Sequence, residues 1–451
     1  MTKFDEKPAR LSCICGCGSA EMFACERTTT LPVDLEVRID RAIEASIFRA
    51  VFPSATTRRN LIASLGSSTL LAALAEALPI GIAQALAQSS VGPIEKTKLS
   101  VGFVPITCTV PLLLADAMGE FRKEGLEVSL QRTPSWALVR DKLISGEFDA
   151  SHLVLGMPFT MTLGIGSSPV MTHVATVQNT NGSAITLAMK HRENRDPKNW
   201  KGFKFGIPHD HSIHAMLLRY YLAEHGLDPD RDVELRVYPP PDSVANMAAG
   251  NLDGLFFAEP WGQRAVFEGV GFIHLLSKDI FPDHPCCTLS VGNRFLSDSP
   301  NSFGAFIRAV VRATAFADKH ENRQHVAELL APANYLNQPR RVLEQVLLGH
   351  YADGLGKVVD APGRIGFDPF PYESTAIWVL TQLRRWKIIP TDVDYKLVAE
   401  RVLLSTGAAK AMADVGLPPP GSGMAKLSIM GREFDPTKPA NYLQQFPIKR
   451  A

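Results

Sequence analysis

Residues 98–131 read KLSVGFVPITCTVPLLLADAMGEFRKEGLEVSLQ, and the order of patterns in this stretch decides the fold. Residues 98–105 form an apolar run typical of a buried strand, residues 111–125 have the spacing of an amphipathic helix that ends at Gly125, and residues 126–131 return to a strand pattern. An order of strand, helix and strand predicts a mostly parallel sheet with helices on both faces. The stretch therefore predicts an α/β fold.

The same alternation continues along the chain and restarts once, near residue 200. It predicts strands at 149–156, 200–210, 232–240, 252–260 and 272–277 and helices at 135–148, 212–226, 242–250, 301–320 and 323–331. We expect two lobes: residues 98–183 as the first part of lobe 1, 184–289 as lobe 2, and 290–451 as the second part of lobe 1 with a helical C-terminal tail. Two α/β lobes joined by two plain connections form a clamshell, which binds its ligand in the cleft.

The composition excludes some classes of partner. The chain has 451 residues, 45% of them hydrophobic, which is enough to fill two or three domain cores. Its 47 basic and 46 acidic residues give a net charge of +1. Because this balance provides neither a basic surface nor an acidic tail, we expect no nucleic-acid partner.

Residues 57–87 have the features of an export signal. Two arginines at 58–59 precede a moderately apolar run that closes on Ala-Leu-Ala at 85–87, the A-x-A pattern of a cleavage site. A membrane anchor is the alternative, but Glu76 and a proline lower the apolar character of the run. We expect a twin-arginine signal, a periplasmic location and a mature chain that starts at Gln88.

The extension over residues 1–56 carries four cysteines, at positions 13, 15, 17 and 25. So dense a group of thiols can ligate zinc or iron, yet the spacing includes no C-x2-C pair. Cleavage after residue 87 would remove this extension from the mature protein. Cys108, Cys286 and Cys287 would then remain, too few for a disulfide scaffold.

From residue 98 to the end, the chain resembles the solute-binding proteins of ABC importers for nitrate, nitrite and bicarbonate. The resemblance rests on SWALVRDKL, GMPFTM, QNTNGSAI, IHAMLLRYYL, VANMAAGNLDGLFFAEPW, DHP and the closing GREFDPTKPANYLQQFPIKR, which follow one another in the family's order. It implies a two-lobed periplasmic-binding-protein type II fold without catalytic activity. It also implies capture of a small oxyanion or a related small polar solute, with a nitrate- or nitrite-like anion favoured, and delivery to an ABC permease of the inner membrane.

The resemblance implies site residues as well. Trp136 and His214 match a pocket tryptophan and a pocket histidine of the family. Ser183 stands where nitrate binders have glutamine. Cys287 stands where nitrate binders have lysine and where bicarbonate binders have a glutamate and use calcium. This sequence has neither residue at that position.

The chemistry of three side chains fits an anion site. Trp136 offers a flat face and an indole N–H donor. Ser212 is a candidate N-cap that would place His214 in the first turn of a helix, where free N–H groups and the helix dipole favour an anion. Glu259 follows an apolar strand, and open α/β sheets bind ligands at the carboxyl ends of their strands. The structural alternatives are core packing for the tryptophan and the histidine, and capping or hinge hydrogen bonds for Glu259.

The dipeptide Cys286-Cys287, in FPDHPCCTLSVG, leaves three alternatives open. The cysteines pack as small apolar side chains, or provide a reactive thiol, or join His284 in holding zinc or copper, since thiolates are soft ligands. Compared with a pocket lysine, Cys287 also lacks a positive charge. The ligand is then neutral or differently shaped, or other donors or a metal compensate for the charge.

Two other functions are compatible with a two-lobed fold. A ligand-sensing regulator of the same family would relay occupancy to a signalling partner, but such sensors lack an export signal. Enzymes similar to the thiamine-pyrimidine synthases use a cysteine-rich motif with more cysteines than the pair seen here, and they are not exported. A binding protein is therefore the leading prediction.

Overall fold

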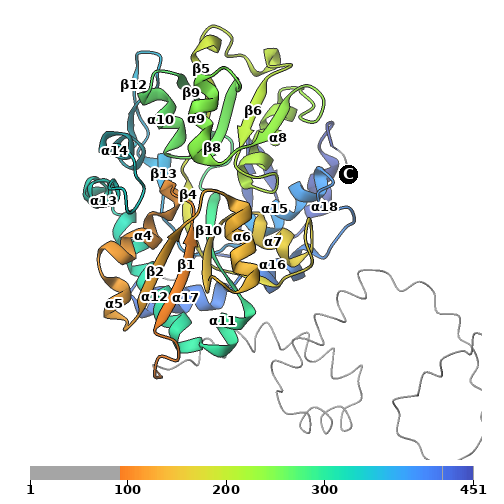
Figure 1. The fold of residues 1–451 in the computed structure, drawn as a ribbon. Helices are drawn as coiled ribbons and strands as arrows, with labels where there is room; N and C mark the ends of the chain where they lie inside the picture. The colour runs from red at the N-terminus through yellow and green to blue at the C-terminus, as the bar shows by residue number, and fades with distance from the viewer. Residues whose placement is uncertain (1–91, 419, 450–451) are drawn as a thin grey trace, which may run out of the picture. The chain divides into compact units, whose positions relative to one another are not determined.

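The computed structural model describes residues 92–418 and 420–449, which form two α/β lobes (Figure 1). The predicted extension 1–56 and export signal 57–87 lie outside the described residues. Within the described ranges, no helix combines the length and the apolar character needed to cross a membrane. Each lobe is built on its own sheet, and Figure 1 shows the two sheets one above the other.

Lobe 1 contains a six-stranded sheet in the order β13-β4-β10-β3-β1-β2. β1 pairs parallel with β2 and β3, as the strand–helix–strand pattern predicts, whereas β10 pairs antiparallel with β3 and β4. β10 lies between two partners and its first seven residues are buried, so it forms the centre of the lobe. The strands are β1 Lys98–Phe103, β2 Glu127–Arg132, β3 Ala150–Val154, β4 Thr172–Asn181, β10 Pro285–Gly292 and β13 Ile365–Gly366.

Lobe 2 contains a five-stranded sheet in the order β7-β6-β8-β5-β9. β6 pairs parallel with β7 and β8, and β5 pairs antiparallel with β8 and β9. The strands are β5 Ser183–Ala188, β6 Lys204–Ile207, β7 Glu234–Val237, β8 Gly254–Ala258 and β9 Gly271–Leu276. Both sheets are therefore mixed rather than mostly parallel, because β5 and β10, the strands that follow the passages between lobes, run against their neighbours.

The chain enters lobe 2 through a single residue, Gly182, which separates β4 from β5. Its φ of +75° is left-handed, and a Cβ there would lie 2.8 Å from the side-chain Nδ2 atom of Asn179, so glycine suits the position. The chain returns over residues 277–284, and β10 belongs to the lobe 1 sheet from Pro285 onward. The return therefore lies a few residues before the predicted boundary at 289.

Serine caps start the two helices that carry predicted site residues. Ser135 precedes α6 (Trp136–Ser145), and its side chain accepts from the backbone N–H of Leu138 at 3.4 Å. Ser212 precedes α8 (Ile213–Glu224) and accepts from the N–H of Ala215 at 3.1 Å, which confirms the predicted N-cap. The other α-helices between residues 92 and 330 are α4 Val110–Ala117, α5 Glu120–Lys123, α7 Met157–Thr162, α9 Pro240–Ala248, α10 Trp261–Phe267, α11 Asn293–Asp298, α12 Pro300–Asp318 and α13 Arg323–Leu330.

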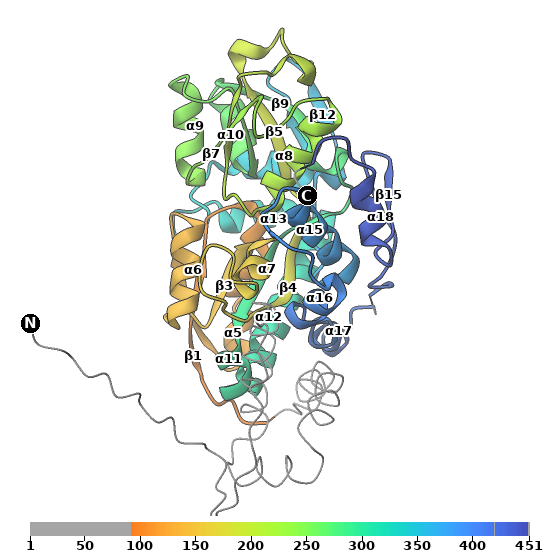
Figure 2. The same ribbon diagram turned by 90° about the vertical axis from the view of Figure 1, so that its right-hand side faces the viewer.

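The C-terminal part of the chain contacts both lobes. α15 packs against α8 of lobe 2, whereas α16 and α17 pack on β4 of lobe 1. Figure 2 shows α15 to α18 gathered along one side of the molecule. The elements are α14 Arg340–Leu348, β11 His350–Ala352, β12 Val358–Asp360, α15 Glu373–Arg385, α16 Tyr395–Val402, α17 Ser405–Asp414, β14 Leu427–Ile429, β15 Arg432–Phe434 and α18 Pro439–Gln444.

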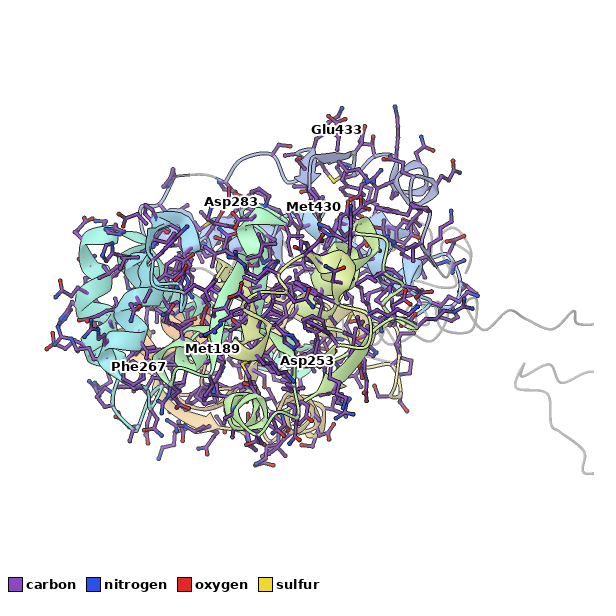
Figure 3. The ribbon with its side chains drawn as sticks, turned by 90° about the horizontal axis from the view of Figure 1, so that it is seen from above. Met189, Asp253, Phe267, Asp283, Met430 and Glu433 are labelled. Carbon is purple, nitrogen blue, oxygen red and sulfur yellow. The ribbon has the colours of Figure 1, made fainter. Side chains whose placement is uncertain are left out.

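Two contacts fix the C-terminal tail on the rest of the fold. The hydroxyls of Tyr442 and Tyr220 lie 3.0 Å apart, which joins α18 to α8. The backbone N–H of Met430, in the turn between β14 and β15, donates to the carbonyl of Ile280 at 2.8 Å. Figure 3 shows Met430 near Asp283, a residue of the return connection, in the view from above. The tail therefore packs next to the place where the chain leaves lobe 2.

Candidate functional site

The three cysteines of the described residues meet in one buried cluster, which we call the thiol cluster: Cys108, Cys286 and Cys287. Cys108 lies in the short 3-10 helix η1 (Thr107–Thr109) that follows β1, and the other two open β10. The sulfur of Cys286 lies 3.5 Å from that of Cys108 and 3.8 Å from that of Cys287. All three side chains are fully buried, and none forms a disulfide.

A β-bulge brings the two neighbouring cysteines to the same side. Successive side chains of a regular strand point to opposite faces, so adjacent sulfurs would be separated by the sheet. Pairing with β4, however, moves from Pro285 opposite Thr180 to Cys287 opposite Asn179, so β10 has one residue more than its partner at this point. Such an extra residue re-aims a side chain. The sequence pattern alone gave no sign of this bulge.

Lobe 2 contributes Ser183 and His214 to the cluster. The Nε2 atom of His214 lies 3.0 Å from the hydroxyl of Ser183 and 3.4 Å from the sulfur of Cys286. The Ser183 hydroxyl is 3.6 Å from the same sulfur. Ser183 opens β5, and His214 lies in the first turn of α8, as predicted from Ser212. The predicted residues Ser183, His214 and Cys287 therefore lie in one place, where the two lobes meet.

Lobe 1 contributes Trp136, His152 and Asn179. The rings of Trp136 and His152 pack with centroids 5.0 Å apart, and Asn179 stands opposite Cys287 in the pairing of β4 with β10. Within the described chain, the Trp136 indole N–H, both ring nitrogens of His152 and the Oδ1 atom of Asn179 have no hydrogen-bond partner, although all are buried. Buried polar atoms without partners cost free energy, so these groups are available to a ligand.

Burial and hydrogen bonding set the protonation of the imidazole and the thiols in the site. Burial lowers the pKa of His152 to about 3, so this imidazole is neutral at physiological pH. Burial raises the pKa of the Cys108 and Cys287 thiols. Burial acts in the same direction on Cys286, but hydrogen bonds from the two other thiols and the neighbouring His214 outweigh it and hold the pKa of Cys286 below its usual value. One of the three sulfurs is thus the preferred thiolate.

Glu259 is placed differently from the thiol cluster. Its buried carboxylate pairs with the buried guanidinium of Arg364 and accepts from the backbone N–H of Gln263 at 2.9 Å. Its backbone carbonyl accepts from the N–H of Thr107 at 2.7 Å, so it links β8 of lobe 2 to η1 of lobe 1. The hinge-type hydrogen bonding that was the structural alternative for Glu259 is therefore present.

His284, the histidine predicted to join a metal site, does not belong to the closest set of ligand atoms. Its Nδ1 atom lies 2.6 Å from the carbonyl oxygen of Phe281, to which it donates. Among the described residues, the group whose ligand atoms all lie within 4.8 Å of one another is the thiol cluster. The third member of this set of possible metal ligands is therefore Cys108, and not His284 as the sequence predicted.

Two open hollows of the described surface lie away from these residues. One, of about 250 Å³, is lined by Lys123, Glu124, Asn301 and Arg308 on the outside of lobe 1. The residues around the thiol cluster are buried instead, so the described conformation is closed over the candidate site.

Sequence reasoning missed Cys108, His152 and Asn179. Cys108 had a signal, since it is the one other cysteine beyond residue 87 and follows a strand at its carboxyl end. His152 lies inside β3, a fully buried strand, and its sequence pattern does not distinguish a ligand-binding histidine from a residue of the core. Asn179 lies in β4, a strand that the pattern did not predict.

Comparison with known proteins gives one family. Residues 92–331 match the model of the NMT1-like family. The nitrate/nitrite binding protein NrtA from Nostoc sp. strain PCC 7120 is 31% identical over 387 residues, which cover 79% of this chain and 87% of that protein. The nitrate import ATP-binding protein NrtC from Synechocystis sp. strain PCC 6803 is also 31% identical, over 79% of this chain, but the chain spans only 56% of NrtC.

Among solved structures, the crystal structure of the periplasmic nitrate-binding protein NrtA from Synechocystis PCC 6803 superimposes with a TM-score of 0.77. The identity is 25%, and the match covers 79% of this chain and all of that protein. This agreement confirms the predicted two-lobed periplasmic-binding-protein fold.

Proposed function

The chain belongs to the NMT1-like family and is a homologue of the nitrate/nitrite binding protein NrtA, and from this premise we propose that it is the solute-binding component of an ABC importer. Its solute is a small oxyanion, with nitrate or nitrite favoured. It binds in the closed site between the lobes, at Trp136, Ser183 and His214. The protein hands the solute to a permease of the inner membrane and catalyses no reaction on it.

The observation that carries this proposal is the set of unpartnered polar groups around the closed site. A small planar anion has little apolar area, so its affinity depends on donors that are already in place. Trp136 keeps an unpartnered indole N–H, and neutral His152 keeps one ring N–H to donate. His214 adds its ring next to the positive end of α8. These groups come from both lobes, so a bound anion would hold the lobes together.

Export through the twin-arginine route to the periplasm is part of the proposal. The twin arginine at 58–59 and the A-x-A pattern at 85–87 support it. A periplasmic NrtA of the same fold supports the location. Loss of uptake of isotope-labelled nitrate in a strain without this protein, restored by the intact gene, would agree with the role in import.

The direct test is calorimetric titration of the purified protein with nitrate, nitrite and bicarbonate. Trp136→Phe keeps an aromatic ring and removes the N–H, so it should weaken binding by about 1–3 kcal/mol. Trp200→Phe is the matched control, because Trp200 is also fully buried with an unpartnered indole N–H but packs against Phe203 and Phe205 in lobe 2. Equal affinities of the two variants, or no binding of any of the three anions to the parent, would overturn the proposal.

A further inference from the structure

The thiol cluster gathers every cysteine of the described chain at one point. Cys108 and Cys286 are 178 residues apart in sequence and come from separate elements, η1 and β10. A β-bulge turns the third sulfur, that of Cys287, to the same side. Core packing of small side chains needs no such convergence, because any apolar residue of similar size fills the same space.

The separations between the sulfur atoms fit a common metal ion. Three sulfurs each about 2.3 Å from one ion lie roughly 3.8–4.0 Å from one another. The observed distances are 3.5 Å between Cys108 and Cys286 and 3.8 Å between Cys286 and Cys287, and all three sulfurs lie within 4.8 Å. Side-chain rotations that move the sulfur atoms by a few tenths of an ångström would complete the site.

We propose that the thiol cluster binds one Cu(I) ion through three sulfur ligands. Thiolates are soft ligands and select Cu(I) or zinc over harder ions. Structural zinc sites take four protein ligands. The described residues bring only three ligand atoms within 4.8 Å of one another, and the ring of His214, 3.4 Å from the sulfur of Cys286, is not one of them. A three-sulfur set suits Cu(I) better than zinc.

Binding exchanges S–H bonds for S–Cu bonds. Each thiol that becomes a thiolate ligand releases its proton to solvent, and Cu(I) enters and stays as Cu(I), so no electron is transferred. Access depends on the lobes: the sulfurs belong to lobe 1, and Ser183 and His214 of lobe 2 contact the sulfur of Cys286. Separation of the lobes exposes the cluster, as in other hinged binding proteins. The inference goes beyond the proposed anion transport and does not rest on it.

The test uses the full chain with Cys13, Cys15, Cys17 and Cys25 replaced by serine, so that the N-terminal thiols do not contribute. This background protein is reduced, kept anaerobic and titrated with Cu(I) in competition with a chromophoric Cu(I) chelator. We expect one Cu(I) per chain and an X-ray absorption spectrum with three sulfurs around copper. Cys108→Ser and Cys287→Ser should each weaken binding by more than about 100-fold, since loss of a merely supporting residue already costs roughly 10- to 100-fold.

His214→Ala tests whether the imidazole beside Cys286 is a copper ligand. It removes the imidazole beside Cys286 and leaves all three sulfurs, so Cu(I) affinity should change by less than a factor of about 10, the lower end of the cost of losing a supporting residue. Thermal melts without metal verify that each variant is folded, and Cu(I) should raise the melting temperature of the background protein but not that of Cys108→Ser. The proposal is overturned if the background protein binds no Cu(I), if the cysteine variants bind it equally well, or if equimolar Zn(II) displaces it.

Discussion

The buried ion pair between Glu259 and Arg364 should be the most sensitive single contact between the lobes. Both side chains have no solvent exposure. Arg364→Met would leave a buried carboxylate without its cation, which costs about 3–5 kcal/mol. The guanidinium also donates to the side-chain oxygen of Gln263 at 2.7 Å and lies 4.1 Å from the ring centre of Tyr351. Loss of the ring contact adds about 1 kcal/mol, so we expect a total loss of about 4–6 kcal/mol.

A double-mutant cycle separates the charge from the packing. Glu259→Gln with Arg364→Met removes both charges and keeps an acceptor for the N–H of Gln263. The double variant should therefore be at least about 2 kcal/mol more stable than Arg364→Met alone, because no uncompensated charge remains buried. Equilibrium urea unfolding followed by tryptophan fluorescence and far-UV circular dichroism measures all four proteins of the cycle.

Arg340 provides the matched control for an exposed pair. Its side chain is 45% exposed and pairs with Glu344 at 2.7 Å and Glu328 at 3.0 Å. Arg340→Met should cost no more than about 1 kcal/mol, because exposed ion pairs contribute little. The reasoning fails if Arg364→Met costs no more than Arg340→Met, or if the double variant is as unstable as Arg364→Met.

Three further predictions concern the site and the N-terminus. Cys287→Lys should gain nitrate or nitrite affinity by about 10- to 150-fold over the parent in calorimetric titration, because a charge-assisted hydrogen bond is worth roughly 1.5–3 kcal/mol; an unchanged anion profile would place Cys287 outside the anion site. Because burial lowers the pKa of His152 to about 3 from 6.5, the unfolded chain binds more protons below pH 6.5. The contribution of His152 to the free energy of unfolding is then complete above that pH, and it should fall by about 2 kcal/mol as the pH drops from 7 to 5. His152→Phe should flatten the pH profile of urea unfolding. A profile as steep as the parent's would count against a buried neutral imidazole. N-terminal sequencing of periplasmic protein should start at Gln88, and recovery of the full chain in the cytosol would refute export.

Local pattern was sufficient to predict most elements of the fold. Strands β1, β2, β3, β6, β7, β8 and β9 and helices α6, α8 and α12 lie where the sequence placed them, because their apolar spacing and serine or glycine ends are local features. Strand direction is not local. The pattern predicted mostly parallel sheets, whereas β5 and β10 run antiparallel because each follows a passage between lobes.

The site was predictable only in part, for a similar reason. Ser183, His214 and Cys287 were predicted from the family resemblance and the cap at Ser212, and the structure brings them close together. Cys108 joins them through tertiary packing across 178 residues, which no spacing rule expresses. Arg364, the partner of Glu259, lies in a connecting segment whose sequence gives no sign of a buried ion pair.

The bulge at Cys286 also sets the parity of β10, that is, which alternate positions face which side of the sheet. Pro285 and Cys287 stand on either side of the extra residue, so they do not share a face as residues i and i+2 of a regular strand would, and counting by twos across Cys286 assigns side chains to the wrong side of the sheet. A protein of the same fold that acquired the dipeptide Cys-Cys without the extra residue would direct one sulfur away from the other. The cluster is thus a property of the local pairing between β10 and β4 at Cys286 and of residue identity together. A sequence alignment that matches the cysteines but ignores the extra residue would therefore predict thiol clusters that cannot form.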